Sequence, residues 1–74
     1  MSFDRKCLIK DSSQVDRVAY SHDLKEMRVW FKDGSTYTYS DVPEWVFGGL
    51  VSNVSPGKYL ASEVKGYYQY RKEM

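Results

Sequence analysis

The chain has 74 residues, which suits one domain and leaves too little sequence for a second independent core. Eleven Lys and Arg against ten Asp and Glu give a net charge of +1, so overall charge does not draw the protein to nucleic acid or to an acidic membrane. The single cysteine, Cys7, excludes an internal disulfide and a multi-cysteine metal site, and an unpaired thiol is typical of a reducing compartment.

Residues 1–14 mix charged side chains with Ser12 and Ser13 and show no period, so we interpret them as an N-terminal arm, with room for a short strand at Cys7-Leu8-Ile9. The arm has no apolar run long enough for a signal peptide or a membrane span. We therefore expect a cytoplasmic protein whose single domain covers residues 15–74.

Three segments after the arm have the pattern of β-strands. Residues 15–20 alternate and are rich in β-branched and aromatic side chains, and residues 21–25 suggest a turn. The clearest alternation runs over 26–32, with one side apolar and the other mixed. Asp33-Gly34 is a hairpin signal, and residues 35–39 return as a third strand. These segments predict a three-stranded antiparallel meander.

The hairpin at Asp33-Gly34 allows two registers, which place Tyr37 and Tyr39 on opposite faces. A two-residue turn gives an aromatic and basic face from the pairs Lys32–Ser35, Trp30–Tyr37 and Arg28–Tyr39. A three-residue loop closed by a left-handed Gly34 instead pairs Phe31 with Ser35, Val29 with Tyr37 and Met27 with Tyr39. Burial favours the second register, because a small core gains more from two tyrosine rings than from two threonines. Its outer face carries Arg28, Trp30, Lys32, Thr36 and Thr38.

Two short helices follow the strands. Pro43 suits the first position of a helix that runs to about Val51 and contains the weakening pair Gly48-Gly49. Ser55-Pro56 begins a second helix, which Gly66 ends. The tail from Tyr67 alternates like a further strand, and an irregular path over the body is the alternative. The fold class is thus α+β: a three-stranded antiparallel meander with two short helices packed on one face. If the tail forms a strand, it adds an extra C-terminal strand to the meander.

The residues that could support catalysis are few and scattered. His22, the only histidine, lies in a predicted turn, and Cys7 lies in the arm beside basic residues that are weak evidence for a reactive thiol. Ser55-Pro56-Gly57-Lys58 lacks the remaining elements of a phosphate-binding loop. The carboxylates form no pair or metal-binding pattern. We expect no enzyme, no cofactor and no metal.

Aromatic residues make up 16% of the chain, and several lie near cations. Such pairs provide stacking surfaces and positive charge for single-stranded nucleic acid. One candidate platform is Trp30 between Arg28 and Lys32, and the second is a basic cluster of Lys58, Lys65, Tyr68, Tyr70, Arg71 and Lys72. RNA or single-stranded nucleic acid is one expected partner. The alternative is a protein partner in a structural module, through self-association or docking; we predict no membrane and no small-molecule substrate.

The order of these elements resembles the KTSC domain family, which is named after the C-terminus of some lysyl-tRNA synthetases and also includes free-standing small bacterial or phage proteins. The resemblance runs from about Ser12 to Arg71. It rests on the strand ending in Phe31, the Gly34 turn, Tyr37-x-Tyr39, Asp41-Val42-Pro43, Ser55-Pro56-Gly57-Lys58-Tyr59 and Gly66-x-Tyr68-x-Tyr70. It implies one small domain, and the synthetase association implies RNA binding.

Overall fold

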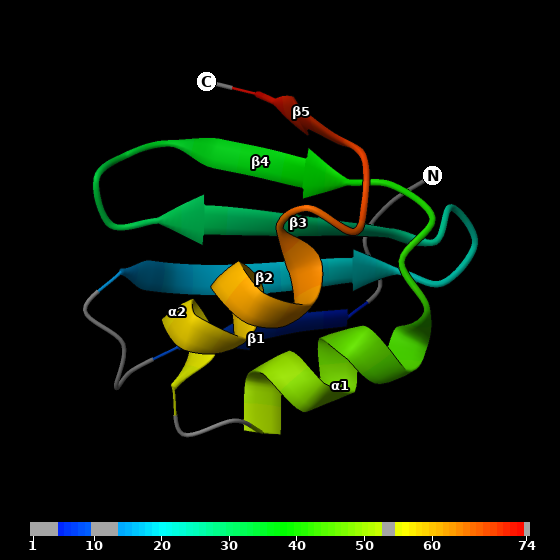
Figure 1. The fold of residues 1–74 in the computed structure, drawn as a ribbon, viewed down its shortest axis with the longest axis horizontal. Helices are drawn as coiled ribbons and strands as arrows, with labels where there is room; N and C mark the ends of the chain where they lie inside the picture. The colour runs from blue at the N-terminus through cyan, green and yellow to red at the C-terminus, as the bar shows by residue number, and fades with distance from the viewer. Residues whose placement is uncertain (1–4, 10–13, 53–54, 74) are drawn as a thin grey trace.

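The computed structural model describes residues 5–9, 14–52 and 55–73, which form an antiparallel five-stranded sheet with helices against it (Figure 1). Its strands, in spatial and chain order, are β1 (Arg5–Leu8), β2 (Val15–Ser21), β3 (Glu26–Phe31), β4 (Thr36–Tyr39) and β5 (Tyr70–Lys72). The helices α1 (Glu44–Ser52) and α2 (Pro56–Tyr59) and the π-helix η1 (Leu60–Val64) connect β4 to β5. The expected α+β class is confirmed, and the tail forms the extra strand.

The sheet has two more strands than the central meander, one at each edge. β1 pairs with β2 through Arg5↔Tyr20 to Leu8↔Arg17, so the short strand expected at 7–9 begins two residues earlier. The first two residues of β1, Arg5 and Lys6, are charged and give no apolar signal, so the sequence pattern placed the start of the strand too late. The rest of the predicted arm, residues 1–4 and 10–13, lies outside the described residues. At the opposite edge, β5 pairs with β4 through Tyr37↔Lys72, Thr38↔Arg71 and Tyr39↔Tyr70.

The hairpin between β3 and β4 has the three-residue loop. Met27 pairs with Tyr39 and Val29 with Tyr37, which confirms the second register. The Phe31 amide donates to the Ser35 carbonyl at 2.9 Å, and the Gly34 amide donates to the Phe31 carbonyl at 3.0 Å. Gly34 has a φ of 96°, a conformation that residues with a Cβ rarely adopt. The turn therefore directs both tyrosines to the side of the sheet that carries the helices.

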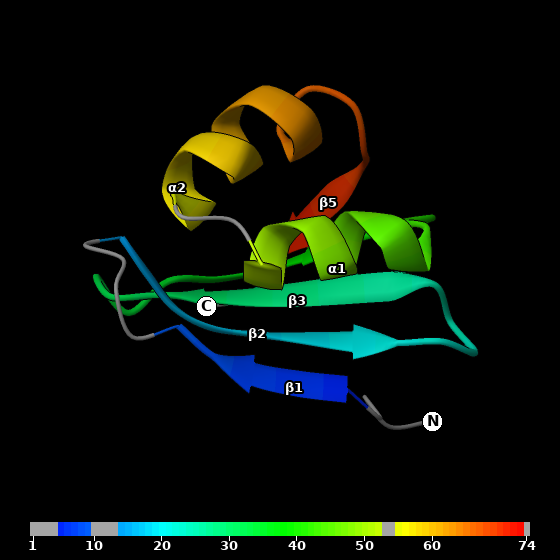
Figure 2. The ribbon, with the colours of Figure 1, turned by 90° about the horizontal axis from the view of Figure 1, so that it is seen from below.

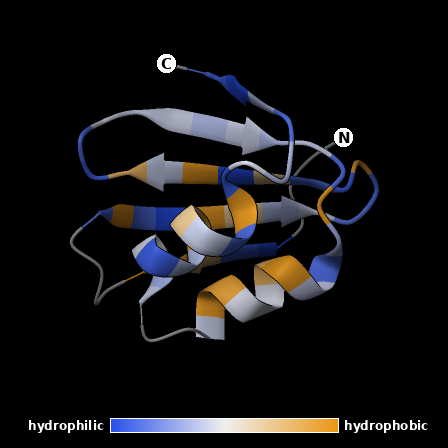
Figure 3. Cartoon of the chain, in the orientation of Figure 1, coloured by the Kyte–Doolittle hydropathy of each residue, from blue (hydrophilic) through white to orange (hydrophobic). Residues whose placement is uncertain are grey.

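All helices lie on one side of the sheet, and the core lies between the two layers (Figure 2). Figure 3 shows the apolar residues concentrated in the central strands and α1, whereas β5 is hydrophilic. Tyr20 joins the layers, because its ring stacks on Phe47 at 5.5 Å between centroids and its hydroxyl donates to the Val42 carbonyl at 2.6 Å. The fully buried apolar side chains include Val15, Val18, Met27, Val29, Val46, Leu50, Leu60 and Val64.

The second predicted helix is divided into two kinds of turn. After α2, the chain widens into η1, and the Lys65 amide donates to the Leu60 carbonyl, five residues back, at 2.8 Å. Gly66 follows with a φ of 87°, so the predicted helix end is confirmed. Within the described residues, no helix is long and apolar enough to cross a membrane.

The two adjacent glycines of α1 should respond oppositely to alanine. A Cβ at Gly48 would meet no atom within 4 Å, so Gly48→Ala should raise the free energy of unfolding by about 0.5–1 kcal/mol through helix propensity. A Cβ at Gly49 would lie 2.5 Å from the Tyr59 hydroxyl, so Gly49→Ala should lower it by about 1–3 kcal/mol through overpacking. Urea unfolding of both variants measures the difference, and equal stabilities would contradict the close packing of α1 on Tyr59.

Candidate functional site

The side of the sheet opposite the helices, here called the open face, carries two cross-strand rows of side chains. Antiparallel pairing places Lys6, Ala19, Arg28, Thr38 and Arg71 in one row, and Leu8, Arg17, Trp30 and Thr36 in the next. Figure 2 shows that every helix in the described part of the chain lies on the opposite side of the sheet. Positive charge and one large aromatic ring therefore meet across β1, β2 and β3.

Trp30 is the centre of the open face and is half-buried rather than fully exposed. The Arg17 guanidinium carbon lies 4.7 Å from the indole centroid and that of Arg28 lies 6.0 Å away, both within cation–π range. A groove of about 430 Å³ adjoins the indole and is lined by Lys6, Cys7, Leu8, Arg17, Val18 and Trp30. Leu8 is 66% exposed at its margin, which adds apolar surface to a basic region.

The β4–β5 end of the open face is an ion-pair network. Arg71 contacts Glu73 (Nε to Oε2, 3.1 Å) and Glu26 (Nη1 to Oε2, 3.6 Å). The hydrogen bond to Glu73 and the Glu26 charge raise the Arg71 pKa, and a hydrogen bond from the Thr38 hydroxyl is the main cause of the lowered Glu73 pKa. Arg28 donates through Nε to the same Thr38 hydroxyl at 3.1 Å. Carboxylates therefore offset positive charge here, and Arg28 connects this network to Trp30.

The residues of the second predicted cluster are divided between the two sides of the sheet. Alternation along β5 places Arg71 on the open face but Tyr70 and Lys72 on the helix side, because neighbouring strand residues point oppositely. Lys58 is exposed on α2, and Tyr68 packs against the core.

The first predicted platform also differs in one member. Arg28 and Trp30 lie on the open face, but Lys32 follows the end of β3, where strand alternation no longer fixes its direction. There it lines a hollow together with Gln14, Phe31, Asp33 and Lys65.

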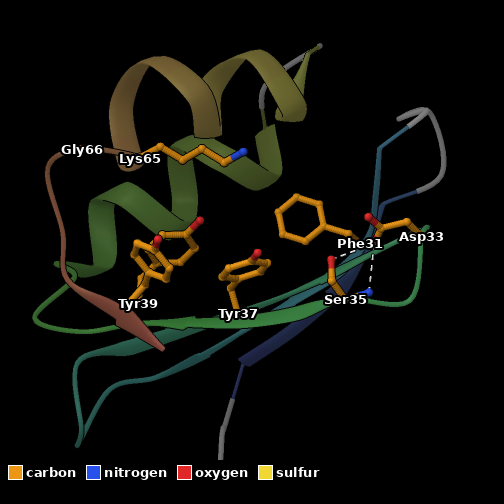
Figure 4. Close-up of a pocket in the computed structure, with 8 residues that line it drawn as sticks. Phe31, Asp33, Ser35, Tyr37, Tyr39, Lys65 and Gly66 are labelled. Atoms are coloured by element: carbon orange, nitrogen blue, oxygen red, sulfur yellow. Dashed lines mark hydrogen bonds between the residues drawn. The ribbon is translucent and has the colours of Figure 1, made fainter. Parts of the chain in front are cut away.

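On the helix side, an aromatic groove of about 410 Å³ lies between η1 and the β4–β5 edge; its lining includes Phe31, Tyr37, Tyr39, Tyr70, Asp33 and Lys65. Figure 4 shows Phe31, Tyr37 and Tyr39 rising from the sheet toward η1, with Lys65 reaching over them. Ring centroids are 5.7 Å apart for Phe31–Tyr37 and 5.5 Å for Tyr37–Tyr70, at interplanar angles of 87° and 54°. The ring planes are steeply tilted against one another, so the rings line the groove as an angled wall and form no flat surface.

Charged groups stand at the Phe31 end of the aromatic groove. The Ser35 hydroxyl and amide donate to Asp33 Oδ1 at 2.7 and 2.9 Å, and these bonds lower the Asp33 pKa, with a smaller contribution from the Lys72 charge. Lys65 Nζ lies 5.7 Å from the Phe31 centroid. Burial is the main cause of a raised pKa for the Tyr39 phenol, and the neighbouring Tyr37 and Tyr70 raise it further. The phenol therefore stays protonated.

Comparison with known proteins identifies the family. The KTSC domain family matches residues 11–68 of the chain. The chain belongs to this family. A crystal structure of a KTSC domain protein from Yersinia pestis is similar, with a TM-score of 0.83 and 29% sequence identity over 92% of this chain and 94% of that one. Comparison with curated proteins finds no match.

His22 and Cys7 of this KTSC domain have different neighbours. His22 Nδ1 lies 3.5 Å from Glu44 Oε1, and Glu44 also pairs with Arg5. Cys7 Sγ is 3.6 Å from the carbonyl of its neighbour Leu8. Among the described residues, no three His, Cys, Asp or Glu side chains gather to hold a metal.

Arg17, Leu8 and the aromatic groove are the features that sequence reasoning missed. Arg17 alternates in β2 like an ordinary surface residue, and only its pairing with Trp30 brings it to the indole. The Tyr37-x-Tyr39 pair signalled aromatic residues on one face. Nothing in the pattern showed that η1 and β5 would make a groove over them.

The Asp33 carboxyl should titrate at lower pH than an ordinary aspartate because Ser35 stabilises its ionised form. Its contribution to turn stability is present at neutral pH and lost as pH falls through this lowered pKa. Ser35→Ala should raise the Asp33 pKa in a carboxyl NMR titration. Ser62→Ala, which removes a hydroxyl bonded to Lys58 on α2, should leave it unchanged; an Asp33 pKa that is the same with and without the Ser35 hydroxyl would contradict the assignment.

Proposed function

We propose that this KTSC domain is a small non-catalytic module that binds RNA or other single-stranded nucleic acid on the open face of its sheet. The supporting observation is the position of Trp30, which lies between Arg17 and Arg28 on a face that no helix covers. An aromatic ring beside guanidinium groups offers stacking surface for bases and positive charge for phosphates.

The half-buried indole and Arg17 act together in this proposal. Arg17 already lies over the ring at 4.7 Å, so an incoming base stacks on the guanidinium plane and extends the existing pair. Lys6 lies in the adjacent row and supplies a flexible charge for the phosphate backbone. A local cluster of this kind does not require a large net charge, which agrees with the value of +1.

The position of the ion-pair network also suggests the path of the strand. Glu26 and Glu73 surround Arg71 at the β4–β5 end and would repel phosphates there. We therefore expect the nucleic acid to run over β1, β2 and β3, where Lys6, Arg17 and Trp30 lie. The unpaired Cys7 supports a cytoplasmic location as part of the same proposal.

One observation favours the alternative, a protein-docking or self-association surface. Leu8 is 66% exposed beside the groove next to Trp30, and a tryptophan with arginines and an apolar margin is typical of interface hot spots. Leu8→Ser distinguishes the two. Leu8→Ser should leave RNA affinity within twofold if the open face binds nucleic acid. If the face instead mediates self-association, the substitution should weaken self-association at least fivefold, as measured by sedimentation of the free chain.

Trp30→Ala should weaken binding to a mixed-sequence single-stranded RNA by about 5- to 150-fold, which corresponds to one lost stacking interaction. Fluorescence anisotropy at low salt measures the affinity. The matched control is Trp45→Ala, because Trp45 is 69% exposed but lies on α1, on the other side of the sheet. Equal affinities of both variants, or no binding by the unchanged chain at low salt, would contradict the proposal.

Lys6→Gln tests the phosphate contact separately from stacking. If Lys6 contacts one phosphate, the slope of log affinity against log salt should become shallower by about one between roughly 50 and 200 mM salt. Lys58→Gln is the control, since Lys58 lies on α2 away from the open face. An unchanged slope for Lys6→Gln would remove this residue from the binding surface.

A further inference from the structure

The aromatic groove is separated from the open face by the thickness of the sheet, and the proposed function makes no use of it. In Figure 1, the helices lie in front of β1, β2 and β3, while β4 and β5 extend beyond them. Aromatic side chains on this side of the sheet are buried where helices cover them, but some are partly accessible over β4 and β5. Tyr70, for example, is 60% exposed. A set of accessible rings in a concave site points to a ligand with an apolar planar part.

The size of the groove limits the ligand. A volume of about 410 Å³ lies near the lower end of the roughly 300–1,000 Å³ typical of small-ligand sites. Neighbouring rings are only 5.5–5.7 Å apart between centroids, so nothing inserts between them and a ligand ring must lie against the wall. One heteroaromatic ring system with its sugar suits this space, whereas a longer polymer segment does not.

The charged groups limit the ligand further. Oδ1 of Asp33 accepts two hydrogen bonds from Ser35, which fill its two acceptor positions and orient the carboxylate. The other oxygen, Oδ2, keeps two acceptor positions for a ligand. Lys65 reaches over the rings and Lys72 lies close enough to act on the Asp33 charge. The site thus offers a fixed acceptor at one point and mobile positive charge around it.

We propose that the aromatic groove binds one guanine base of a nucleotide. The base lies against Tyr37, the ring between Phe31 and Tyr70, and Oδ2 of Asp33 accepts from its Watson–Crick edge. Guanine alone among the common bases has two adjacent N–H donors on that edge, and the two acceptor positions of Oδ2 can take both. Adenine presents a ring nitrogen acceptor there, which the carboxylate repels. Lys65 pairs with the phosphate.

A cationic ligand is the main competitor, because angled aromatic rings with a carboxylate also suit a quaternary ammonium group. The Lys65 ammonium, however, already lies over Phe31, and the positive charge of Lys72 acts on Asp33. A second cation would meet both positive charges, whereas a phosphate would be attracted by them. The distribution of charge therefore favours an anionic ligand with a neutral ring.

The test compares guanosine and adenosine monophosphates on the full chain by NMR chemical-shift titration. GMP should bind at least tenfold more tightly than AMP. Asp33→Asn keeps an oxygen for Ser35 but loses the carboxylate, and should bring the two affinities within twofold. Tyr70→Ala should weaken both nucleotides at least fivefold, and because Tyr70 is exposed the fold should tolerate the change. Asp23→Asn, in the β2–β3 turn, is the control that should leave GMP binding unchanged.

A base in this groove could come from a free nucleotide or from an RNA strand, and two short oligonucleotides, UUGUU and UUAUU, separate these sources. A preference for GMP without oligonucleotide binding identifies a free nucleotide, and a guanine preference in the oligonucleotides that Asp33→Asn removes identifies a strand. Equal binding of guanine and adenine in both formats, a preference that survives Asp33→Asn, or binding of choline in place of GMP would overturn the proposal. Failure of RNA binding on the open face would instead appear as oligonucleotide affinities that Trp30→Ala does not change, whatever GMP does.

Discussion

The turn between β3 and β4 determines what each face of the sheet displays. Gly34 adopts a left-handed conformation, and the loop therefore holds three residues. Tyr37 is consequently paired with Val29 and not with Trp30. A slip of one residue would exchange the faces, because strand side chains alternate. The tyrosines would then face solvent, and the threonines would replace them beneath η1. Both candidate surfaces depend on this one backbone conformation.

The layer arrangement explains why a small domain can present two different surfaces. A single layer of helices leaves one side of the sheet exposed, and basic and aromatic residues keep that side compatible with water. On the other side, the helices are too few to cover five strands, so Tyr37 on β4 and Tyr70 on β5 remain partly accessible. Incomplete coverage thus produces a groove, while absence of coverage produces an open face.

The central parts of the fold were predictable because local signals and burial agreed there. Alternation in β3, the Asp33-Gly34 turn and the helix end at Gly66 each led to the observed structure. The edge strand β1 starts with charged residues, and its pairing depends on distant partners, so periodicity misplaced it. The basic cluster predicted at residues 58–72 is divided between two faces for a related reason. Alternation along β5 places Arg71 on the open face, whereas Tyr70 lies on the helix side, where it lines the aromatic groove together with Lys65.

The π-helix η1 has a consequence for how the chain can vary in length. Its turn, closed between Lys65 and Leu60, holds one residue more than an α-helical turn. Deleting one residue between Leu60 and Val64 would leave an α-helical turn with the same two ends, because the wider turn holds its extra residue within a single revolution. Lys65 would then keep its direction toward Phe31. A deletion in the regular helix α1 would instead rotate all later helical residues by about 100°, so η1 is the helical stretch in which the loss of a residue is accommodated most easily.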